Sequence, residues 1–147
     1  MKFSINNENI KIFFRENGEM KTYTFTLFTD ENDKETISFV AMLPFDILYH
    51  DSSVNPRSIV DLEPMIQEFY DKNPQLFPSL AILEVEDNNT GKIKVFDGQH
   101  KAAAQLFLRS NKLFIRVFVN AQKTKLKRTN FRAVSYTHLT LPTILLV

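Results

Sequence analysis

The segment Asp97-Gly98-Gln99-His100-Lys101 lies between an apolar run typical of a strand, residues 93–96, and an alanine-rich run typical of a helix, residues 102–108. A glycine allows the backbone to turn sharply between two such elements. The first N–H groups of a helix have no partner within the helix, and the helix dipole adds partial positive charge at that end. Because an anion can bind there without other machinery, the segment predicts a phosphate or nucleotide site that His100 and Lys101 close over.

The composition is that of an ordinary globular protein. With 147 residues, 44% hydrophobic and 24% charged, the chain is long enough for one domain with a sizeable core. It contains no cysteine, which excludes disulfides, thiolate metal sites and thiol catalysis and is typical of a reducing compartment. The first residues lack the apolar stretch of a signal peptide, and no run reaches membrane-spanning length. We therefore expect a cytoplasmic protein with no membrane partner.

The charges are divided unevenly along the chain. All 17 acidic residues and half of the 18 basic residues precede position 98, which leaves net charges of −8 and +9 on the two parts. A basic face attracts phosphate-bearing ligands and nucleic acid. Residues 123–132 are the densest basic segment and predict a DNA contact, through Lys123, Lys125, Lys127, Arg128 and Arg132, with Phe131 available for stacking. The alternatives are a solvated linker and a basic face balanced by the acidic part of the chain.

The last residues differ in character from the rest. Residues 134–143, Val-Ser-Tyr-Thr-His-Leu-Thr-Leu-Pro-Thr, resemble the translation of a transposase-type sequencing adaptor. We therefore expect the natural sequence to diverge near Arg132 or Ala133, with residues 134–147 as a non-native tail on a truncated metagenomic reading frame. Residues 121–133 are then a basic extension at the start of the truncated region. The alternative is that the tail is a genuine apolar strand.

The first 42 residues predict an antiparallel β meander. Residues 10–14 and 22–28 have the alternation of apolar and polar side chains that is typical of strands. Asn17-Gly18 favours a turn between them, and residues 36–42 predict a third strand.

The rest of the chain predicts a mixture of helices and strands. Ser58 is a suitable N-cap, although Pro64 allows the first helix to begin later or to be kinked. The predicted elements are, in chain order, a helix over residues 58–72, strands over 80–85 and 93–96, a helix from the Gly98 turn to about Arg109, and a strand over 113–119. The last of these is the clearest buried strand in the sequence.

The order of these pieces resembles the ParB/sulfiredoxin superfamily, in its DGQHR branch, over residues 43–120. The resemblance rests on Asn55-Pro56-Arg57, on the segment from Asp97 to Lys101 followed by two alanines, and on the Ile-Arg-Val-Phe-Val strand at residues 115–119. It implies an α+β fold, a small mixed sheet with two main helices, preceded by the meander over residues 1–42. It also implies a nucleotide, CTP or ATP with Mg²⁺, in contact with Arg57, Gly98, Gln99, His100 and Lys101.

Two features depart from the family pattern. The family motif usually ends in arginine, whose planar fork binds phosphate through two parallel hydrogen bonds, whereas Lys101 offers a single mobile charge. Sulfiredoxin chemistry needs a cysteine nucleophile, and this chain has none, so that reductase activity is excluded.

Three of the candidate residues have alternative roles. Asp97 is the candidate metal ligand, holding Mg²⁺ against a triphosphate, or else it caps the following helix. His100 is a candidate catalytic acid or base, a phosphate donor, or a local hydrogen-bonding residue. Arg57 contacts phosphate, or else pairs with a nearby surface carboxylate.

Three functions are consistent with these residues. The first is a nucleotide- or phosphate-binding module in a DNA-linked process such as partitioning, DNA modification or defence regulation, which can act as a homodimer. The second is a Mg²⁺-dependent nuclease or nucleotidase with Asp97 and His100 as catalytic residues. The third is a non-catalytic regulatory or scaffold protein in which the pocket is only structural. The single carboxylate in the motif favours binding over catalysis.

Overall fold

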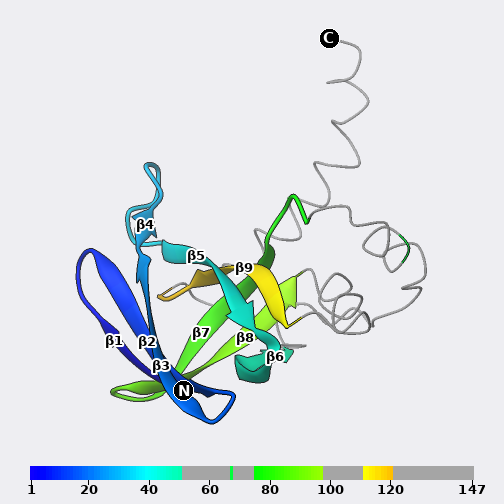
Figure 1. Ribbon diagram of the computed structural model, residues 1–147. Helices are drawn as coiled ribbons and strands as arrows, with labels where there is room; N and C mark the ends of the chain where they lie inside the picture. The colour runs from blue at the N-terminus through cyan, green and yellow to red at the C-terminus, as the bar shows by residue number, and fades with distance from the viewer. Residues whose placement is uncertain (51–66, 68–74, 98–110, 121–147) are drawn as a thin grey trace.

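The computed structural model describes residues 1–50, 67, 75–97 and 111–120 of the chain (Figure 1). The elements in these ranges are strands β1 (Lys2–Ile5), β2 (Asn9–Glu16), β3 (Glu19–Thr26), β4 (Phe28–Thr29), β5 (Ile37–Pro44), β6 (Leu48–His50), β7 (Ser79–Asp87), β8 (Thr90–Asp97) and β9 (Lys112–Phe118), with one short 3-10 helix, η1 (Phe45–Ile47), between β5 and β6. None of the helical residues described here belongs to a helix long and apolar enough to cross a membrane.

The strands form one sheet that curls into a nearly closed barrel. Neighbouring strands follow the order β3-β2-β1-β8-β7-β9-β5-β4, and β6 pairs with β8 on the same edge as β1. Two pairings are parallel, β6 with β8 and β7 with β9, and the others are antiparallel. The two ends of the sheet approach each other where Phe25 of β3 stacks on Phe39 of β5, with ring centroids 5.2 Å apart.

The β2–β3 hairpin confirms the strands and the turn predicted for this part of the sequence. Asn17 and Gly18 both have positive φ, 53° and 82°, and connect the paired residues Glu16 and Glu19. A two-residue turn with positive φ at both positions matches the twist of the flanking strands, which is why Asn-Gly is favoured there. The register that this turn sets places Phe14, Tyr23 and Phe25 on the inner side, where their rings stack in a row.

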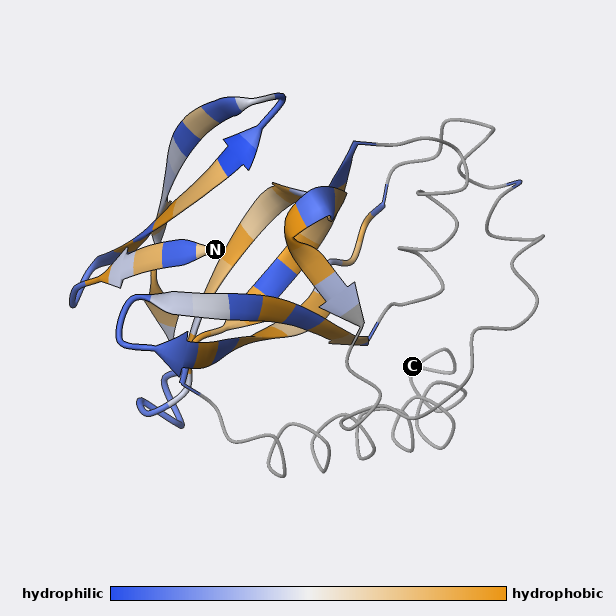
Figure 2. Ribbon diagram, turned by 90° about the horizontal axis from the view of Figure 1, so that it is seen from below, coloured by the Kyte–Doolittle hydropathy of each residue, from blue (hydrophilic) through white to orange (hydrophobic). Residues whose placement is uncertain are grey.

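The core lies inside the curled sheet and is formed by alternate residues of the strands. Figure 2 shows the hydrophobic residues concentrated along the strands and the hydrophilic ones at the turns. The largest side chains that are fully buried on the inner face are Phe39, Ile10, Ile12, Leu43, Ile93, Leu113, Ile115 and Val117. Fully burying one such side chain contributes about 1.5–3 kcal/mol.

A second, smaller apolar cluster lies on the opposite face of β7, β8 and β9. Ile82, Phe96 and Phe118 are buried there, and the rings of Phe96 and Phe118 lie 6.4 Å apart. Because β9 contributes side chains to both clusters, its sequence is a nearly continuous apolar run. This explains the prediction of a buried strand at residues 113–119, which is confirmed.

The predicted α+β fold, with a small sheet and two main helices, is wrong. The described part of the chain is 67% strand and 5% helical, and its sheet has nine strands. The predicted meander is confirmed for the β2–β3 hairpin and for the antiparallel pairing of Phe28 with Ser38, but most of β5 pairs with β9, which the meander did not include. The physical reason is that the amino-terminal strands complete the same barrel as β7, β8 and β9 by long-range pairing. The predicted helices, over residues 58–72 and from Gly98 to Arg109, fall largely outside the described residues. The sulfiredoxin-like fold is not retained, because nine strands form one curled, barrel-like sheet.

The first prediction concerns the inner core. Phe39→Ala should lower the free energy of unfolding by about 3–5 kcal/mol, because the ring is fully buried and stacks on Phe25. The matched control Phe28→Ala, at a side chain that is 56% exposed, should cost about 0.5 kcal/mol or less. Urea unfolding followed by far-UV circular dichroism measures both. Equal losses for the two variants would contradict the core described here.

The second prediction concerns Gly91 of β8. A Cβ at this position would lie 2.7 Å from the carbonyl oxygen of Glu84 and 3.0 Å from Cδ1 of Leu83. Gly91→Ala should therefore cost about 1–3 kcal/mol, since the neighbouring strand β7 must move. Gly91→Asn should be at least as harmful. At Gly18 nothing lies within 4 Å of a Cβ, but φ is +82°, so Gly18→Asn should cost only the strain of positive φ, about 1 kcal/mol. If Gly91→Asn were as mild in the same unfolding assay, the close approach would be refuted.

Candidate functional site

Asp97 is the one residue of the predicted phosphate site that lies within the described ranges. It is half-buried and ends β8, where it pairs with Leu80 of β7 just before a register shift. The prediction of a strand over residues 93–96 is confirmed. Arg57, Gly98, Gln99, His100 and Lys101 lie outside the described residues.

Two predicted segments nevertheless begin at the same edge of the sheet. Strands β6 and β8 are parallel neighbours, and His50 at the end of β6 pairs with Val95 near the end of β8. The chain toward Arg57 therefore continues from beside the point where the chain toward Lys101 continues. At this end of the barrel β6 and β8 end, at His50 and Asp97, and β7 and β9 begin, at Ser79 and Lys112. We call it the Asp97 edge.

The basic segment predicted to contact DNA, residues 123–132, lies outside the described ranges. The chain leads to it from the opposite edge of the sheet. Asn120 follows β9, and its side-chain oxygen accepts a hydrogen bond of 2.8 Å from the backbone N–H of Ile37, the first residue of β5. The chain thus leaves the barrel at one end toward the predicted nucleotide site and at the opposite end toward the predicted DNA contact.

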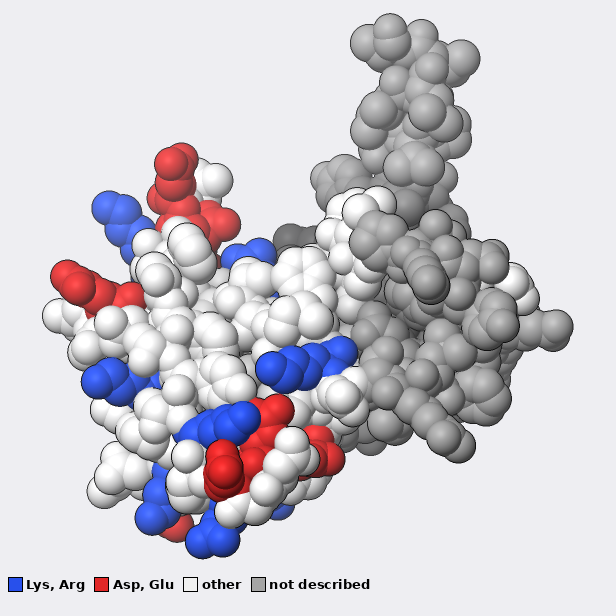
Figure 3. All heavy atoms as spheres, in the orientation of Figure 1, with Lys and Arg blue, Asp and Glu red and all other residues white. Residues whose placement is uncertain are grey.

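On the face drawn in Figure 3, the described residues form no dominant basic patch. Figure 3 shows cationic and anionic side chains interleaved on one face. Lys94 forms an ion pair of 3.0 Å with Glu84, and Lys92 one of 3.1 Å with Glu86. Arg116 donates a hydrogen bond of 3.0 Å from Nε to the Ser38 hydroxyl and lies over the Phe118 ring. Within the described ranges, no group of three His, Asp or Glu side chains is placed to hold a metal ion.

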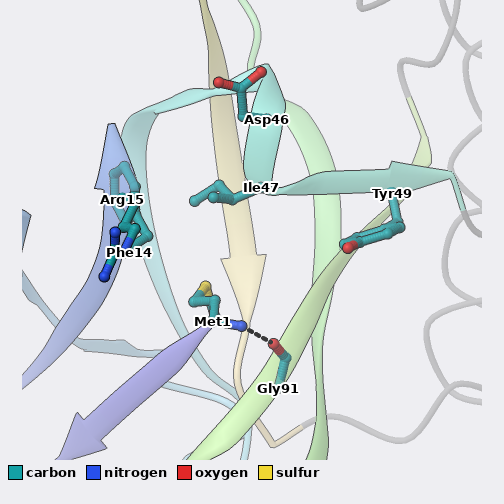
Figure 4. Close-up of a pocket in the computed structure, with 7 residues that line it drawn as sticks. All are labelled: Met1, Phe14, Arg15, Asp46, Ile47, Tyr49 and Gly91. Atoms are coloured by element: carbon teal, nitrogen blue, oxygen red, sulfur yellow. Dashed lines mark hydrogen bonds between the residues drawn. The ribbon is translucent and has the colours of Figure 1, made fainter. Parts of the chain in front are cut away.

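A pocket of about 250 Å³ lies on the β1 side of β8 (Figure 4). It exists because two strands share one edge of β8: β1 pairs at Thr90, and β6 pairs from Ile93 to Val95. Between these two contacts Gly91 pairs with Met1, the residue before β1, whose carbonyl accepts a hydrogen bond of 3.0 Å from the Gly91 N–H. The residues that line the pocket are Met1, Phe14, Arg15, Asp46, Ile47, Tyr49 and Gly91.

Sequence reasoning missed this pocket. Its lining comes from β2, η1, β6 and β8 together with the residue before β1, so no contiguous motif marks it. The α-amino group of Met1 donates a hydrogen bond of 3.4 Å to the Gly91 carbonyl and closes one side. The Nζ atom of Lys92 lies 5.3 Å from the centroid of the Tyr49 ring and covers one face of it. The pocket therefore combines cationic groups with an aromatic wall.

A polar cluster lies next to the pocket, at the tip of the β2–β3 hairpin. The Tyr23 hydroxyl donates a hydrogen bond of 2.9 Å to Glu16, and Lys21 lies 3.7 Å from the same carboxylate oxygen. The hydrogen bond from Tyr23, with the nearby charges of Lys21 and Lys112, lowers the pKa of Glu16 below its ordinary 4.5. The same hydrogen bond raises the pKa of Tyr23 above 10.0. Lys112 links the tip to the Asp97 edge, with its Nζ atom 5.6 Å from the Tyr23 ring centroid.

The geometry can be set beside known proteins. No protein-family model matches the chain, and a search of curated proteins finds no similar sequence. Membership of the DGQHR branch therefore stays a prediction that rests on the residues of the motif alone.

The third prediction tests the hairpin tip. Tyr23→Phe removes the hydrogen bond that favours ionised Glu16, so the pKa of Glu16 should rise toward 4.5. Because that pKa is lowered in the folded protein, Glu16 stabilises it above pH 4.5, and this contribution is lost as pH falls through the folded pKa. Titration of the Glu16 carboxyl by NMR measures the shift. The control Tyr49→Phe should leave the Glu16 pKa unchanged, and an unchanged value in Tyr23→Phe would contradict the assignment.

Proposed function

We propose that the protein binds a phosphate-bearing ligand at the Asp97 edge, a nucleoside triphosphate such as CTP or ATP with Mg²⁺, as a module in a DNA-linked process. The observation that carries the proposal is the parallel pairing of β6 and β8, from whose adjacent ends the chain continues toward Arg57 and toward Gly98–Lys101. In open α/β sheets, ligands bind beyond the carboxyl ends of parallel strands, and the adjacent parallel ends of β6 and β8 resemble that arrangement locally. The segment from Gly98 to Lys101 adds glycine, amide, imidazole and ammonium groups suited to phosphate.

Binding without turnover is the form of the function that we favour. Asp97 is the one carboxylate in the predicted motif, and phosphoryl-transfer sites commonly hold their metal ions with more than one acidic ligand. A switch that senses nucleotide needs no more than differential binding. The proposal keeps the cytoplasmic location expected from the cysteine-free sequence, and DNA contact through residues 123–132 belongs to it as an extension.

The fourth prediction tests the proposed site. Lys101→Ala should weaken binding of CTP or ATP about tenfold, because it removes a charge-assisted hydrogen bond to phosphate. The control is Lys34→Ala, which removes an exposed lysine from the loop that leads to the opposite edge of the sheet. Calorimetry and thermal shift with and without Mg²⁺ measure the effect. The proposal fails if neither nucleotide stabilises the protein, or if both variants weaken binding equally.

Activity assays separate binding from catalysis. Hydrolysis of nucleotide or cleavage of plasmid DNA that disappears in Asp97→Ala would replace the switch with an enzyme. A gel shift that weakens with salt and is lost on deletion of residues 123–132 would establish the DNA contact.

A further inference from the structure

The outer face of β5 and β9, on the other side of these strands from the barrel core, carries exposed apolar side chains. The two strands are antiparallel neighbours, with Val40 opposite Arg116 and Met42 opposite Phe114 (Figure 1). Residues directly opposite each other in such a pair lie on the same face of the sheet. Val40 is 41% exposed and Met42 is 52% exposed, whereas the residues that alternate with them on β5 belong to the core.

The apolar surface extends to both sides of these strands. Phe28 of β4 is exposed and pairs with Ser38, two residues before Val40, so its side chain lies on the same face. The segment that leads into β7 lies beside β9, because the Gln75 side chain donates a hydrogen bond of 3.1 Å to the Phe114 carbonyl. The two residues after Gln75 are exposed. We call the surface formed by Phe28, Val40, Met42, Leu76 and Phe77 the β5 face.

A single arginine lies among these apolar side chains. Arg116 is half-buried and donates a hydrogen bond of 3.0 Å from Nε to the Ser38 hydroxyl. Its guanidinium carbon lies 4.9 Å from the centroid of the Phe118 ring. Because Ser38 and Phe118 are both buried, these contacts hold the guanidinium in place. The other N–H groups of the guanidinium are suited to donate to an anion.

Arg116 differs from three lysines of the sheet in its lack of an anionic partner. Lys94, Lys92 and Lys21 lie 3.0, 3.1 and 3.7 Å from glutamate carboxylates. In the part of the chain that the structure describes, no carboxylate forms an ion pair with Arg116. The attraction between opposite charges is stronger near apolar surface than in water, because the effective dielectric constant is lower. The β5 face therefore presents a positioned cation that a partner's carboxylate can neutralise.

We propose that the β5 face docks a segment of a partner protein in which one carboxylate side chain is flanked by apolar ones. The carboxylate pairs with Arg116, and the apolar side chains cover Val40 and Met42. An arginine fork matches the two oxygens of a carboxylate. Arginine and methionine are also enriched at protein interfaces. The β5 face includes none of the residues proposed to bind nucleotide, so this interaction goes beyond the proposed function.

A second copy of the chain fits this surface less well. A two-fold axis through the β5 face would bring Arg116 against the same residue of the other copy. The five side chains that form the face are apolar, so none of them supplies a carboxylate between the two guanidinium groups.

Nucleic acid also fits less well. It is bound mainly by several cations that contact its phosphates. Residues 30–35, in the loop that leads into β5, carry four carboxylates and one lysine, and this excess repels a polyanion. Ile37, where the loop meets β5, lies three residues from Val40, or about 10 Å along the strand. Because the Debye length is about 8 Å at physiological salt, the loop has little effect on a single carboxylate at Arg116.

The first test selects a phage-displayed library of random short peptides against the full chain. Peptides that bind should carry Asp or Glu flanked by Leu, Ile or Phe, and they should be depleted when the target is the Arg116→Gln variant. The proposal is overturned if no peptide is enriched, or if the enriched peptides lack an acidic residue.

Calorimetry with an enriched acidic peptide then locates the contacts. Arg116→Gln should weaken binding about tenfold, because charge-assisted hydrogen bonds are lost, and Met42→Ser about fivefold, because apolar burial is lost. The matched controls Arg15→Gln and Met20→Ser, at an exposed arginine and an exposed methionine on β2 and β3, should change the Kd by less than about twofold. Circular dichroism checks that each variant is folded. If Arg116→Gln does not fold, Arg116→Lys replaces it and should weaken binding about threefold, since it keeps the charge without the fork.

A double-mutant cycle distinguishes docking from a structural role of Arg116. Replacing the acidic residue of the peptide by its amide should weaken binding to the wild type and have little further effect on Arg116→Gln. Independent, additive losses would mean that Arg116 only shields Phe118 from water, and would overturn the proposal.

Two further measurements assign the occupant. If sedimentation shows a dimer that Met42→Ser dissociates, the β5 face is covered by a second copy and the proposal is wrong. Lys101→Ala should leave peptide binding unchanged, so the nucleotide site and the β5 face can fail independently.

Discussion

The burial of inward-facing side chains on β2, β5, β7, β8 and β9 is the interaction on which the barrel depends. Ile12, Phe39, Ile93 and Ile115 have no exposed surface, although they come from four strands in separate parts of the chain. Their mutual packing requires the sheet to curl until its ends approach each other. The stacking of Phe25 on Phe39 is the direct sign of that approach. Everything at the rims, including the Asp97 edge and the pocket, is positioned by this inner packing.

The Asp97 edge and the pocket arise from the same strand in different ways. At its carboxyl end β8 lies beside a parallel neighbour, so the chain continues from adjacent points toward the two segments that we propose bind phosphate. Toward its start the same side of β8 is shared between β1 and β6, and the pocket lies there. β8 thus positions the first site through its parallel neighbour β6 and the pocket through the place where β1 and β6 meet the same side of the strand. Gly91 belongs to the second arrangement, because β7 passes too close for a side chain.

Local structure could be predicted from the sequence where a pattern reports on one face or one turn. The alternation in residues 10–14 and 22–28, the Asn17-Gly18 turn and the apolar run of β9 all led to the correct elements. β1 and β6 were missed, because segments of four and three residues are too short to show a period. The pairing of β5 with β9 could not be predicted either, since alternation indicates which side is buried and not which strand lies alongside.

The same limit explains what was missed in the sites. The strand over residues 93–96 was predicted correctly because it is a short, mainly apolar run. The α+β class was wrong because the sequence pattern does not show that the amino-terminal strands join β7, β8 and β9 in one curled sheet. The pocket had no sequence pattern at all, since Phe14, Ile47 and Tyr49 meet only after the barrel has closed.

The pairing of β1 with β8 and of β5 with β9 has a consequence for how the protein is made. Lys2 meets Thr90, and Ser38 meets Phe118, so the first strands leave the ribosome long before their partners exist. Proteins dominated by such distant contacts fold slowly, because the cost of closing long loops precedes the gain from pairing. Until β9 emerges, the edge of β5 is open to the strands of other nascent chains, and chaperone binding during translation would protect it.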